Sequence, residues 1–544
     1  MKITFLPKNK VCNITSGMTI LDAGALLGID IDGNCSGAGT CGRCKVKVIE
    51  GNQQDLDDAE KNLLTKKELS EGLRLACRFK PTLNTVVEVP KSDFAVKRKT
   101  KLLNLPDWFT YIINERKGFG LAFDIGTTTV VAMLWDYITG ELIDIKAISN
   151  PQGVYGADVI SRIMYATDSP GNLAKINEMI INCLNELIEG FAYANKLDKN
   201  DISAITVVGN TTMSHIFAGV NPIGLASAPY TPVFLKGKKA SAKSFGINAG
   251  VNTSLYLLPN LAGHVGSDIT AGMLATNILK ENRNELFVDI GTNGEIVLVA
   301  KGRALTCSTA AGPAFEGATV YQGMRAAGGA IERIKIDKDN VDLVVIDDLE
   351  PVGICGSGII DAVAQLLLNG IIDSTGKFAK KEELIDRGYS LNISNRLRRN
   401  GRIMEFVIAY LGGGDDIVIT QKDIREVQLA KAAIFAGINI LMKSLEIEVS
   451  DLDWISLAGA FGNYVDKESA LAIGLLPEVD IKKIISVGNA AGVGASLALL
   501  SQGMEVGIEE ITSGIKHIEL SSYHEFQEEF LNAMSFINFN KIDR

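Results

Sequence analysis

The chain has 544 residues, which is enough for about three or four domains of ordinary size. Hydrophobic residues make up 47% and charged residues 22% of the chain, a composition that is typical of a globular protein and excludes a disordered one. The net charge of −10 argues against a nucleic-acid-binding surface, as does the lack of any long basic run.

The start of the chain and its most apolar stretch both argue against a membrane protein. Residues 1–7 lead into no long apolar core of the kind that a signal peptide has. Polar residues and glycines interrupt residues 484–500, which predicts a strand, a turn and a buried helix instead of a membrane span. We therefore expect a cytoplasmic protein, in which eight cysteines indicate metal or redox chemistry and not a disulfide framework.

Short strands and helices alternate in residues 1–96, which we predict to be one α+β domain. Capping boxes predict helices that begin near Thr19 and Asp57. Alternating or apolar runs predict strands at 1–5, 10–14, 45–50, 73–76 and 85–89.

Four cysteines in this domain have the spacing of an iron–sulfur site. Five residues separate Cys35 from Cys41, two separate Cys41 from Cys44, and Cys77 follows at a distance. Plant-type [2Fe–2S] proteins use four, then two, then a remote cysteine, so this loop has one extra residue. A structural zinc site is the competing interpretation, but the long loop and the strand–helix pattern favour a β-grasp ferredoxin. Backbone N–H groups could point at the cluster sulfurs from three loop glycines, Gly37, Gly39 and Gly42.

A connector at 97–117 leads to two similar segments, LAFDIGTTTV at 121–130 and LFVDIGTNGEI at 286–296. Each has an apolar run, an aspartate, a Gly-Thr turn and a second apolar run, which predicts a β-hairpin. The turn glycines would let N–H groups approach a phosphate, and the hydroxyl groups add donors. An aspartate beside the turn can hold Mg²⁺ through water. Two such hairpins that face each other would hold one nucleotide from both sides.

These segments give the candidate nucleotide site. We expect Asp124 and Asp289 to organise Mg²⁺ and phosphate. A third segment, LAGAFGN, follows an apolar run and is expected to place Gly459 and Gly462 near adenine or ribose. Glu316 is a candidate base for the attacking water, whose activation the sequence leaves open. The two turns supply the other cofactor-binding candidates: Gly126, Thr127, Thr128, Gly291, Thr292, Asn293 and Gly294.

Three further charged residues have an open assignment. Asp158 and Asp268 each lie at a predicted helix start, where helix capping explains them at least as well as a place in the cleft. Lys431 lies on a helix that a capping box at 420–423 begins, and it could reach either a nucleotide or solvent.

The two hairpins and the third segment resemble the phosphate-1, phosphate-2 and adenosine motifs of the sugar kinase, Hsp70 and actin superfamily (ASKHA). This resemblance implies an α/β, two-lobed, actin-like ATPase fold with ATP and Mg²⁺ bound between the lobes. We place the first lobe at 118–283 and the second at 284–505, and we expect residues 506–544 to pack on the second lobe as a tail.

The combination of domains predicts coupled chemistry. A ferredoxin domain moves single electrons, and an actin-like ATPase changes its closure with nucleotide state. Fused in one chain, they indicate that ATP hydrolysis drives an electron transfer that is otherwise uphill.

Nearly the whole chain resembles the bacterial reductive activators of corrinoid-dependent enzymes, which carry an N-terminal [2Fe–2S] domain. The resemblance rests on the four cysteines, both hairpins, NPQ at 150–152, AGPAFEG at 311–317 and LAGAFG at 457–462. It implies ATP-dependent transfer of one electron from the cluster to the Co(II) corrinoid of a partner protein, giving Co(I). It also implies a partner from a methyltransferase or acetyl-CoA pathway system, a low-potential electron donor and a homodimer.

Two sequence absences agree with this resemblance. His215, His264, His517 and His524 all lack the Asp-x-His-x-x-Gly context of a cobalamin-binding motif, so the corrinoid is expected on the partner. No cysteine follows Cys355, so the C-terminal [4Fe–4S] clusters of the archaeal activators are absent.

Three other functions compete. An activator of the 2-hydroxyacyl-CoA dehydratase type would bind a [4Fe–4S] cluster within the ATPase half, but Cys183, Cys307 and Cys355 there lack a paired spacing. A small-molecule kinase, with Asp268 as its base, would leave the ferredoxin domain unexplained. A redox-sensing ATPase module would be indicated by ATP turnover that rises with a corrinoid protein while no Co(I) forms.

Overall fold

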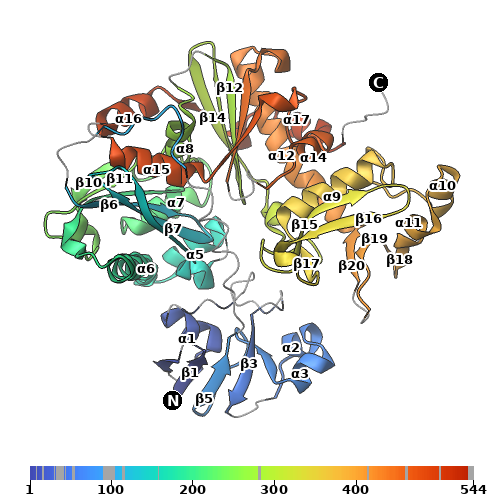
Figure 1. Cartoon of the computed structure of the whole chain (residues 1–544), viewed down its shortest axis with the longest axis horizontal. Coiled ribbons are helices and arrows are strands. Elements are labelled where there is room, and N and C mark those ends of the chain that lie inside the picture. The colour runs from blue at the N-terminus through green and yellow to red at the C-terminus, as the bar shows by residue number, and fades with distance from the viewer. Residues whose placement is uncertain are drawn as a thin grey trace. The chain divides into compact units, whose positions relative to one another are not determined.

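The structure is a computed structural model (Figure 1). It describes residues 1–7, 9–14, 17–27, 29, 31, 39, 42, 44–51, 55–89, 104–112, 117–156, 158–279, 283–412, 416–459, 464–501 and 504–536. The described residues form two compact units. The first draws on 1–100, 111–258 and 499–502, and the second on 101–110, 259–498 and 503–544.

The N-terminal domain is a five-stranded sheet in the order β2-β1-β5-β3-β4, with short helices beside it (Figure 1). β1 and β5 are parallel, and the other neighbours are antiparallel. Its core holds Phe5, Val46, Leu75 and Val87, all without exposed surface. Its elements are β1 (Lys2–Leu6), β2 (Lys10–Asn13), α1 (Ile20–Leu26), β3 (Lys45–Glu50), α2 (Asp58–Leu63), α3 (Lys66–Ser70), β4 (Leu73–Leu75) and β5 (Thr85–Glu88).

The first lobe contains a six-stranded sheet in the order β10-β11-β9-β6-β7-β8. β6, β7 and β8 form an antiparallel meander, while β9 and β11 run parallel to β6. Its elements are β6 (Phe119–Ile125), β7 (Thr129–Asp136), β8 (Leu142–Ser149), η1 (Pro151–Tyr155), α5 (Val159–Asp168), α6 (Asn172–Asn195), β9 (Ile202–Gly209), α7 (Thr211–Phe217), β10 (Lys238–Ser241) and β11 (Ser254–Leu257).

The second lobe repeats this arrangement in the order β22-β21-β12-β13-β14-β23. β12, β13 and β14 form the antiparallel meander, and β21 and β22 run parallel to β12. Its main elements are β12 (Glu285–Ile290), β13 (Gly294–Ala300), β14 (Arg303–Thr309), η5 (Pro313–Glu316), α9 (Gly356–Leu368), α12 (Gln421–Leu445), β21 (Trp454–Ala458), α14 (Lys467–Ala472), β22 (Ile484–Gly488), α15 (Ala490–Leu500), α16 (Met504–Ser513), β23 (Lys516–His517) and α17 (Phe526–Asn532). α8 (Ser267–Thr276) comes before β12 in the chain and belongs to the same compact unit as this sheet.

Two small sheets are inserted between the meander and α12, in the orders β16-β15-β17 and β18-β19-β20. The inserted elements are β15 (Ala330–Ile336), β16 (Val341–Val345), β17 (Gly353–Ile354), α10 (Lys381–Asp386), α11 (Leu391–Arg396), β18 (Leu397–Asn400), β19 (Ile403–Ala409) and β20 (Ile417–Thr420). The sheets confirm the predicted fold class, an α+β ferredoxin domain followed by an α/β ATPase with a repeated lobe topology.

Local sequence explains the two longest helices. α6 buries Ile176, Ile180, Leu184 and Phe191 on one stripe, which belongs to the same hydrophobic core as apolar residues of β6, β7 and β9. Figure 1 shows α6 beside this sheet. α12 begins at Thr420, whose side chain accepts from the backbone N–H of Asp423, and the Asp423 side chain bonds back to the N-cap, forming the predicted capping box.

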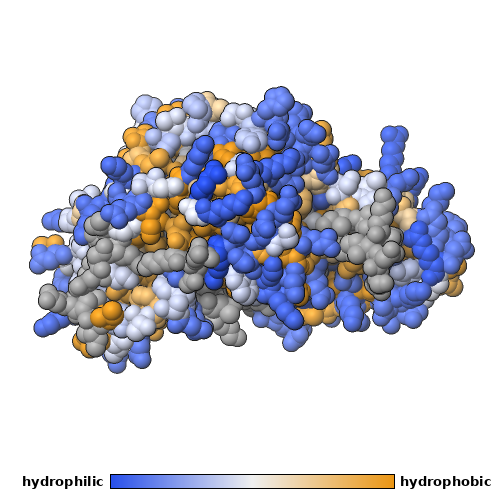
Figure 2. Space-filling view, turned by 90° about the horizontal axis from the view of Figure 1, so that it is seen from above, coloured by the Kyte–Doolittle hydropathy of each residue, from blue (hydrophilic) through white to orange (hydrophobic). Residues whose placement is uncertain are grey.

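Hydrophilic side chains cover much of the face seen in Figure 2, with smaller hydrophobic patches between them. Within the described ranges, none of the helices has both the length and the apolar character needed to cross a membrane.

Candidate cluster and nucleotide sites

The antiparallel pairing of β3 with β4 brings two of the four predicted cluster ligands together. Cys44 directly precedes β3, Cys77 follows β4, and Lys45 pairs with Leu75 between them. Both cysteines are buried, and the backbone N–H of Cys77 donates to Cys44 Sγ over 3.5 Å. Cys35 and Cys41 lie outside the described residues. The described half of the site fits an iron–sulfur cluster, since the cluster needs buried thiolates and N–H donors to sulfur.

Two loop glycines are required by conformation and space. Gly39 and Gly42 have φ values of +75° and +66°, a region that other residues rarely adopt. A Cβ at Gly39 would lie 2.9 Å from Arg78 Cδ, and one at Gly42 would lie 3.3 Å from Leu63 Cβ. Their small size therefore lets the backbone at these two positions lie close to Arg78 and Leu63. Gly37 is outside the described residues.

A buried ion pair holds the strand that leads to Cys77. Arg74 Nε and Nη2 donate to the two carboxylate oxygens of Glu60 over 2.8 and 2.7 Å, and the Leu75 N–H donates to Glu60 Oε1 over 3.1 Å. The side chains of Arg74 and Glu60 are only 8% and 1% exposed. α2 is thereby fixed to β4, two residues from the cluster ligand.

The first predicted hairpin is present as β6 and β7, joined across residues 126–128. Asp124 lies near the end of β6, partly exposed. The Gly126 N–H donates to the Thr129 carbonyl over 3.0 Å, so it closes the turn. The Thr127 hydroxyl accepts from Asn210 Nδ2 over 2.8 Å. The N–H of Gly126 is therefore used within the turn. Other N–H or hydroxyl groups of the turn would have to donate to a phosphate.

Two side chains hold this turn from within the lobe. Asn150 Nδ2 donates to the Gly126 carbonyl over 2.8 Å, and its backbone N–H donates to the Thr128 carbonyl over 2.8 Å. Arg162 Nη2 donates to the Thr127 carbonyl over 2.9 Å. Asn150 also caps η1, so it ties the turn to the start of the helical region.

The second predicted hairpin is present as β12 and β13, joined across residues 291–293. The Gly291 N–H donates to the Asn293 carbonyl over 3.0 Å, as Gly126 does in the first turn. The Thr292 hydroxyl donates to Glu316 Oε1 over 2.5 Å. The structure thus brings together Thr292 and Glu316, which the sequence predicted separately.

Carboxylates gather beside this turn. Asp289 pairs with Glu295 across the hairpin ladder. Burial raises the pKa of Glu295 well above its ordinary value, and the charges of Asp268 and Asp289 raise it further. Asp268 and the predicted Mg²⁺ ligand Asp289 therefore both lie within electrostatic reach of Glu295. In the described ranges, however, no three His, Cys, Asp or Glu side chains are placed to hold a metal ion together.

Two predicted glycines lie tightly packed in the second lobe. Gly459 has φ +90°, and a Cβ there would lie 2.5 Å from Asp289 Oδ1. A Cβ at Gly294 would lie 2.7 Å from both Ile434 Cγ1 and Thr309 Oγ1, so this glycine is needed for packing beneath the turn. Gly459 borders the carboxylate itself. Gly462 lies outside the described residues.

Two of the charged residues with open assignments have hydrogen-bond partners in the structure. Asp158 caps α5, since its carboxylate accepts from the Ser161 N–H over 2.8 Å. Lys431 reaches neither nucleotide nor solvent: it is buried, and its Nζ donates to the Ser535 carbonyl over 2.6 Å.

Sequence reasoning missed several polar residues of these sites. Arg162 and Asn210 act through hydrogen bonds between segments that the sequence keeps far apart. Glu295 could have been found from the sequence, because it is the one charged residue in the otherwise apolar strand GEIVLVA. An acidic residue in a strand that is buried on both faces indicates a polar site nearby.

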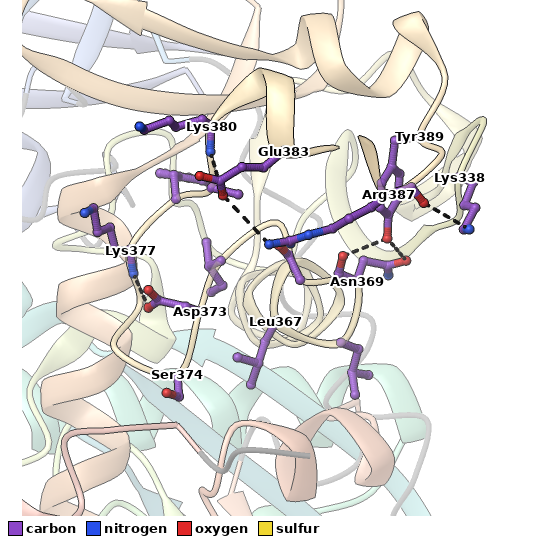
Figure 3. A pocket seen from close by; sticks show the side chains of 15 residues that line it. Lys338, Leu367, Asn369, Asp373, Ser374, Lys377, Lys380, Glu383, Arg387 and Tyr389 are labelled. Atoms are coloured by element: carbon purple, nitrogen blue, oxygen red, sulfur yellow. Dashed lines mark hydrogen bonds and ion pairs between the residues drawn. The ribbon is translucent and has the colours of Figure 1, made fainter. Parts of the chain in front are cut away.

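A pocket of about 730 Å³ lies in the second unit, beside the end of α9 and α10 (Figure 3). Lys338 Nζ donates to the Arg387 carbonyl over 3.2 Å, and the Tyr389 hydroxyl donates to the Asn369 carbonyl over 2.7 Å. The described candidate site residues do not line this pocket. Its cationic lining side chains are Lys338, Lys377, Lys380 and Arg387.

Comparisons with known proteins cover most of the chain. Residues 3–82 match the family model of the 2Fe-2S iron-sulfur cluster binding domain. Residues 119–281 match the model of the RACo middle region, and residues 283–543 match that of the C-terminal domain of RACo, the ASKHA domain.

Individual proteins agree with these models. The corrinoid activation enzyme RamQ of Eubacterium limosum is 39% identical over 78% of this chain and 71% of its own length. The [Co(II) methylated amine-specific corrinoid protein] reductase of Methanosarcina barkeri is 27% identical over 77% of both chains. A solved structure titled reductive activator for corrinoid,iron-sulfur protein is 32% identical, with a TM-score of 0.69 over 98% of both chains.

Proposed function

This chain belongs to the family of reductive activators of corrinoid proteins, and we propose that it reduces the Co(II) corrinoid of a partner protein to Co(I) at the expense of ATP. It is thus an ATP-dependent Co(II) corrinoid reductase, an iron–sulfur oxidoreductase with ATPase activity. The observation that carries this proposal is the fusion, in one chain, of a ferredoxin domain with buried Cys44 and Cys77 and an ATPase with two Asp-Ile-Gly-Thr hairpins.

The energetics explain why an ATPase is needed. A plant-type [2Fe–2S] centre supplies single electrons at roughly −400 mV. For each 59 mV by which the potential of the acceptor lies below that of the cluster, the equilibrium constant for electron transfer falls about tenfold. An acceptor a few hundred millivolts lower is therefore reduced only rarely without coupling. ATP binding and hydrolysis would raise the effective potential of the acceptor or trap the reduced product.

We assign the cluster to Cys35, Cys41, Cys44 and Cys77. The Cys77 N–H, which donates to Cys44 Sγ, supports this assignment because such donors stabilise the reduced form of a cluster.

We assign Mg²⁺ and the nucleotide phosphates to the two hairpins. Asp124 and Asp289 hold Mg²⁺ through water, which fits an ion that commonly uses one or two carboxylates together with phosphate oxygens. Glu316 is the candidate base. The nucleotide is bound by Gly126, Thr127, Thr128, Gly291, Thr292, Asn293, Gly294, Gly459 and Gly462.

The remaining parts of the proposal concern organisation. The domain boundaries are 1–96 for the ferredoxin, 97–117 for the linker, 118–283 and 284–505 for the lobes, and 506–544 for the tail. The partner corrinoid protein serves a methyltransferase or acetyl-CoA pathway system, the electron donor has a low potential, and the chain forms a homodimer.

The test is an anaerobic assay with a Co(II) corrinoid protein, a chemical reductant and Mg²⁺. We expect the absorption band of Co(I) to appear with ATP and not without it. Asp289→Asn should prevent this ATP-dependent step while the visible absorption of the cluster stays normal. Cys77→Ser should remove or alter that absorption and abolish Co(I) formation. Reduction at the same rate without ATP would refute the proposal.

A further inference from the structure

Arg162 is a fully buried cation beside the first hairpin turn. It lies on α5 with none of its surface exposed. Its Nη2 donates to the carbonyls of Thr127 and Gly156 over 2.9 and 2.8 Å, and Nε donates to Gly156 over 3.2 Å. Nη1 contacts Gln152 Oε1 at 3.4 Å and Met213 Sδ at 3.2 Å.

No carboxylate of the described residues is among these partners, although together they engage all five N–H donors of the guanidinium. The acidic neighbour is Asp158, whose carboxylate accepts from the Ser161 N–H and hydroxyl group over 2.8 and 2.9 Å. The charge of Arg162 is therefore solvated by protein dipoles but not neutralised by a direct ion pair. A buried charge in this state is stabilised by nearby anions, and Asp158 supplies only part of that stabilisation because it makes no direct ion pair with Arg162.

The hydrogen bonds of Arg162 and Asn150 also orient two peptide groups. In a planar trans peptide the C=O and N–H bonds point in opposite directions. The Gly126 carbonyl points to Asn150 and the Thr127 carbonyl points to Arg162. The N–H groups of Thr127 and Thr128 must then point away from these two side chains, toward the outer side of the turn. Two adjacent N–H groups on one side form a site for an anion.

We propose that Arg162 is a positioning residue for nucleotide phosphate in the first lobe. Its guanidinium fixes the Thr127 carbonyl so that the Thr128 N–H faces a phosphate oxygen, and its charge, which no direct ion pair neutralises, adds attraction for that phosphate. This inference rests on the proposed function, since it takes ATP as the ligand of the first hairpin.

The experiment measures binding of ATP and adenosine to the full chain. In Arg162→Met, we expect the Kd for ATP to rise by about tenfold to a hundredfold, the range for a lost hydrogen bond to a charged group. Adenosine has no phosphate, so its Kd should stay within about twofold. Arg162→Lys keeps the charge but loses the planar fork, so its ATP affinity should fall between wild type and Arg162→Met.

A matched control separates this role from loss of a buried arginine. Arg396 in the second unit is also buried, and its Nη1 donates to the carbonyls of Val407 and Ile408 over 2.9 Å. Arg396→Met should lower the melting temperature and leave both affinities unchanged. Circular dichroism and the cluster absorption check folding, and if Arg162→Met is unfolded, Arg162→Lys decides the outcome.

Two results would overturn the proposal: unchanged ATP affinity in the folded Arg162 variants, or equal losses for ATP and adenosine. A wild-type chain that binds no ATP would instead refute the proposed function, so the two failures are distinguishable.

Discussion

At the residue scale, Gly459 is the position most closely tied to a predicted catalytic carboxylate. Its backbone passes so near Asp289 that a Cβ would lie 2.5 Å from Oδ1 and 2.7 Å from the Ile290 carbonyl. Only a residue without a side chain leaves Asp289 in its place.

Gly459→Ala should therefore displace Asp289 and lower the kcat/KM for ATP by about tenfold or more, because small misplacements at a reacting centre have large effects. Gly302→Ala is the control. Gly302 has φ +70°, and a Cβ there would meet no heavy atom of the described residues within 4 Å. The control therefore shares the backbone strain of about 1 kcal/mol without the clash. Steady-state ATPase kinetics of both variants check this. Equal kinetics in the two variants would contradict the assigned role of Asp289.

The Glu60–Arg74 pair gives a second residue-scale prediction. Glu60→Gln leaves a buried guanidinium without its counter-charge, which should destabilise the ferredoxin domain by about 3–5 kcal/mol. Anaerobic denaturant titrations followed by cluster absorption should show loss of the cluster at a lower midpoint. Asp58→Asn removes the exposed partner of Lys61 and should not move that midpoint. A shift of similar size in both variants would count against the buried pair.

His215 makes stability pH-dependent. Its Nδ1–H donates to the Thr211 carbonyl over 2.7 Å, and its Nε2 accepts from the Val233 N–H over 3.0 Å, so the ring is held neutral. Burial lowers the pKa of His215 below its ordinary value of 6.5. The unfolded chain then binds the proton more readily, so this contribution is complete above pH 6.5 and is lost as pH falls through the lowered value.

We expect thermal melts between pH 7.5 and 5.5 to show a smaller loss of stability on acidification in His215→Gln than in wild type, whatever the starting stability. His524→Gln is the control, because His524 is exposed and the same substitution there changes no buried histidine. Parallel pH profiles for wild type and His215→Gln would exclude this residue as a source of the pH dependence.

At the element scale, close contact between α8 and α15 depends on a glycine. A Cβ on Gly494 would lie 1.8 Å from the carbonyl oxygen of Ala271. The backbone of α15 at Gly494 therefore lies directly against the backbone of α8 at Ala271. This contact is one turn of α8 away from Asp268.

Gly494→Ala should force these helices apart and destabilise the chain by about 1–3 kcal/mol or more. Gly507 in α16 has open space around it among the described residues, so Gly507→Ala should instead stabilise its helix by about 0.5–1 kcal/mol. Thermal unfolding of the two variants measures the predicted loss of stability in Gly494→Ala and the predicted gain in Gly507→Ala. A neutral Gly494→Ala would show that the helices can relax without loss.

The sequence correctly predicted the helices and strands whose formation depends on residues close together in the chain. Both hairpins, the capped start of α12 and the strands of the ferredoxin domain follow from patterns within a few residues. The inserted sheets β15–β17 and β18–β20 were not predicted, because their pairing depends on contacts outside each strand.

At the scale of the whole molecule, polar contacts between distant segments were the part that the sequence did not reveal. Lys431 illustrates this: its partner Ser535 lies 104 residues away, and burial lowers the pKa of Lys431 to about 8. Gln428 on the same helix donates to the Met534 carbonyl over 3.0 Å. No sequence pattern around Lys431 or Gln428 predicts these partners. Likewise, none predicts that Arg162 donates to the Thr127 carbonyl.

If the whole molecule works as proposed, one electron passes from the reduced cluster to cobalt only when ATP is present. The most direct measurement is a single turnover without external reductant: the protein is reduced, freed of donor and mixed anaerobically with Co(II) corrinoid protein and Mg²⁺, and cluster and Co(I) absorption are recorded together. We predict that, with ATP, cluster oxidation and Co(I) formation proceed at the same rate and in equal amounts, and that neither occurs without ATP. Cluster oxidation without Co(I), or Co(I) formation that ignores ATP, would contradict this coupling.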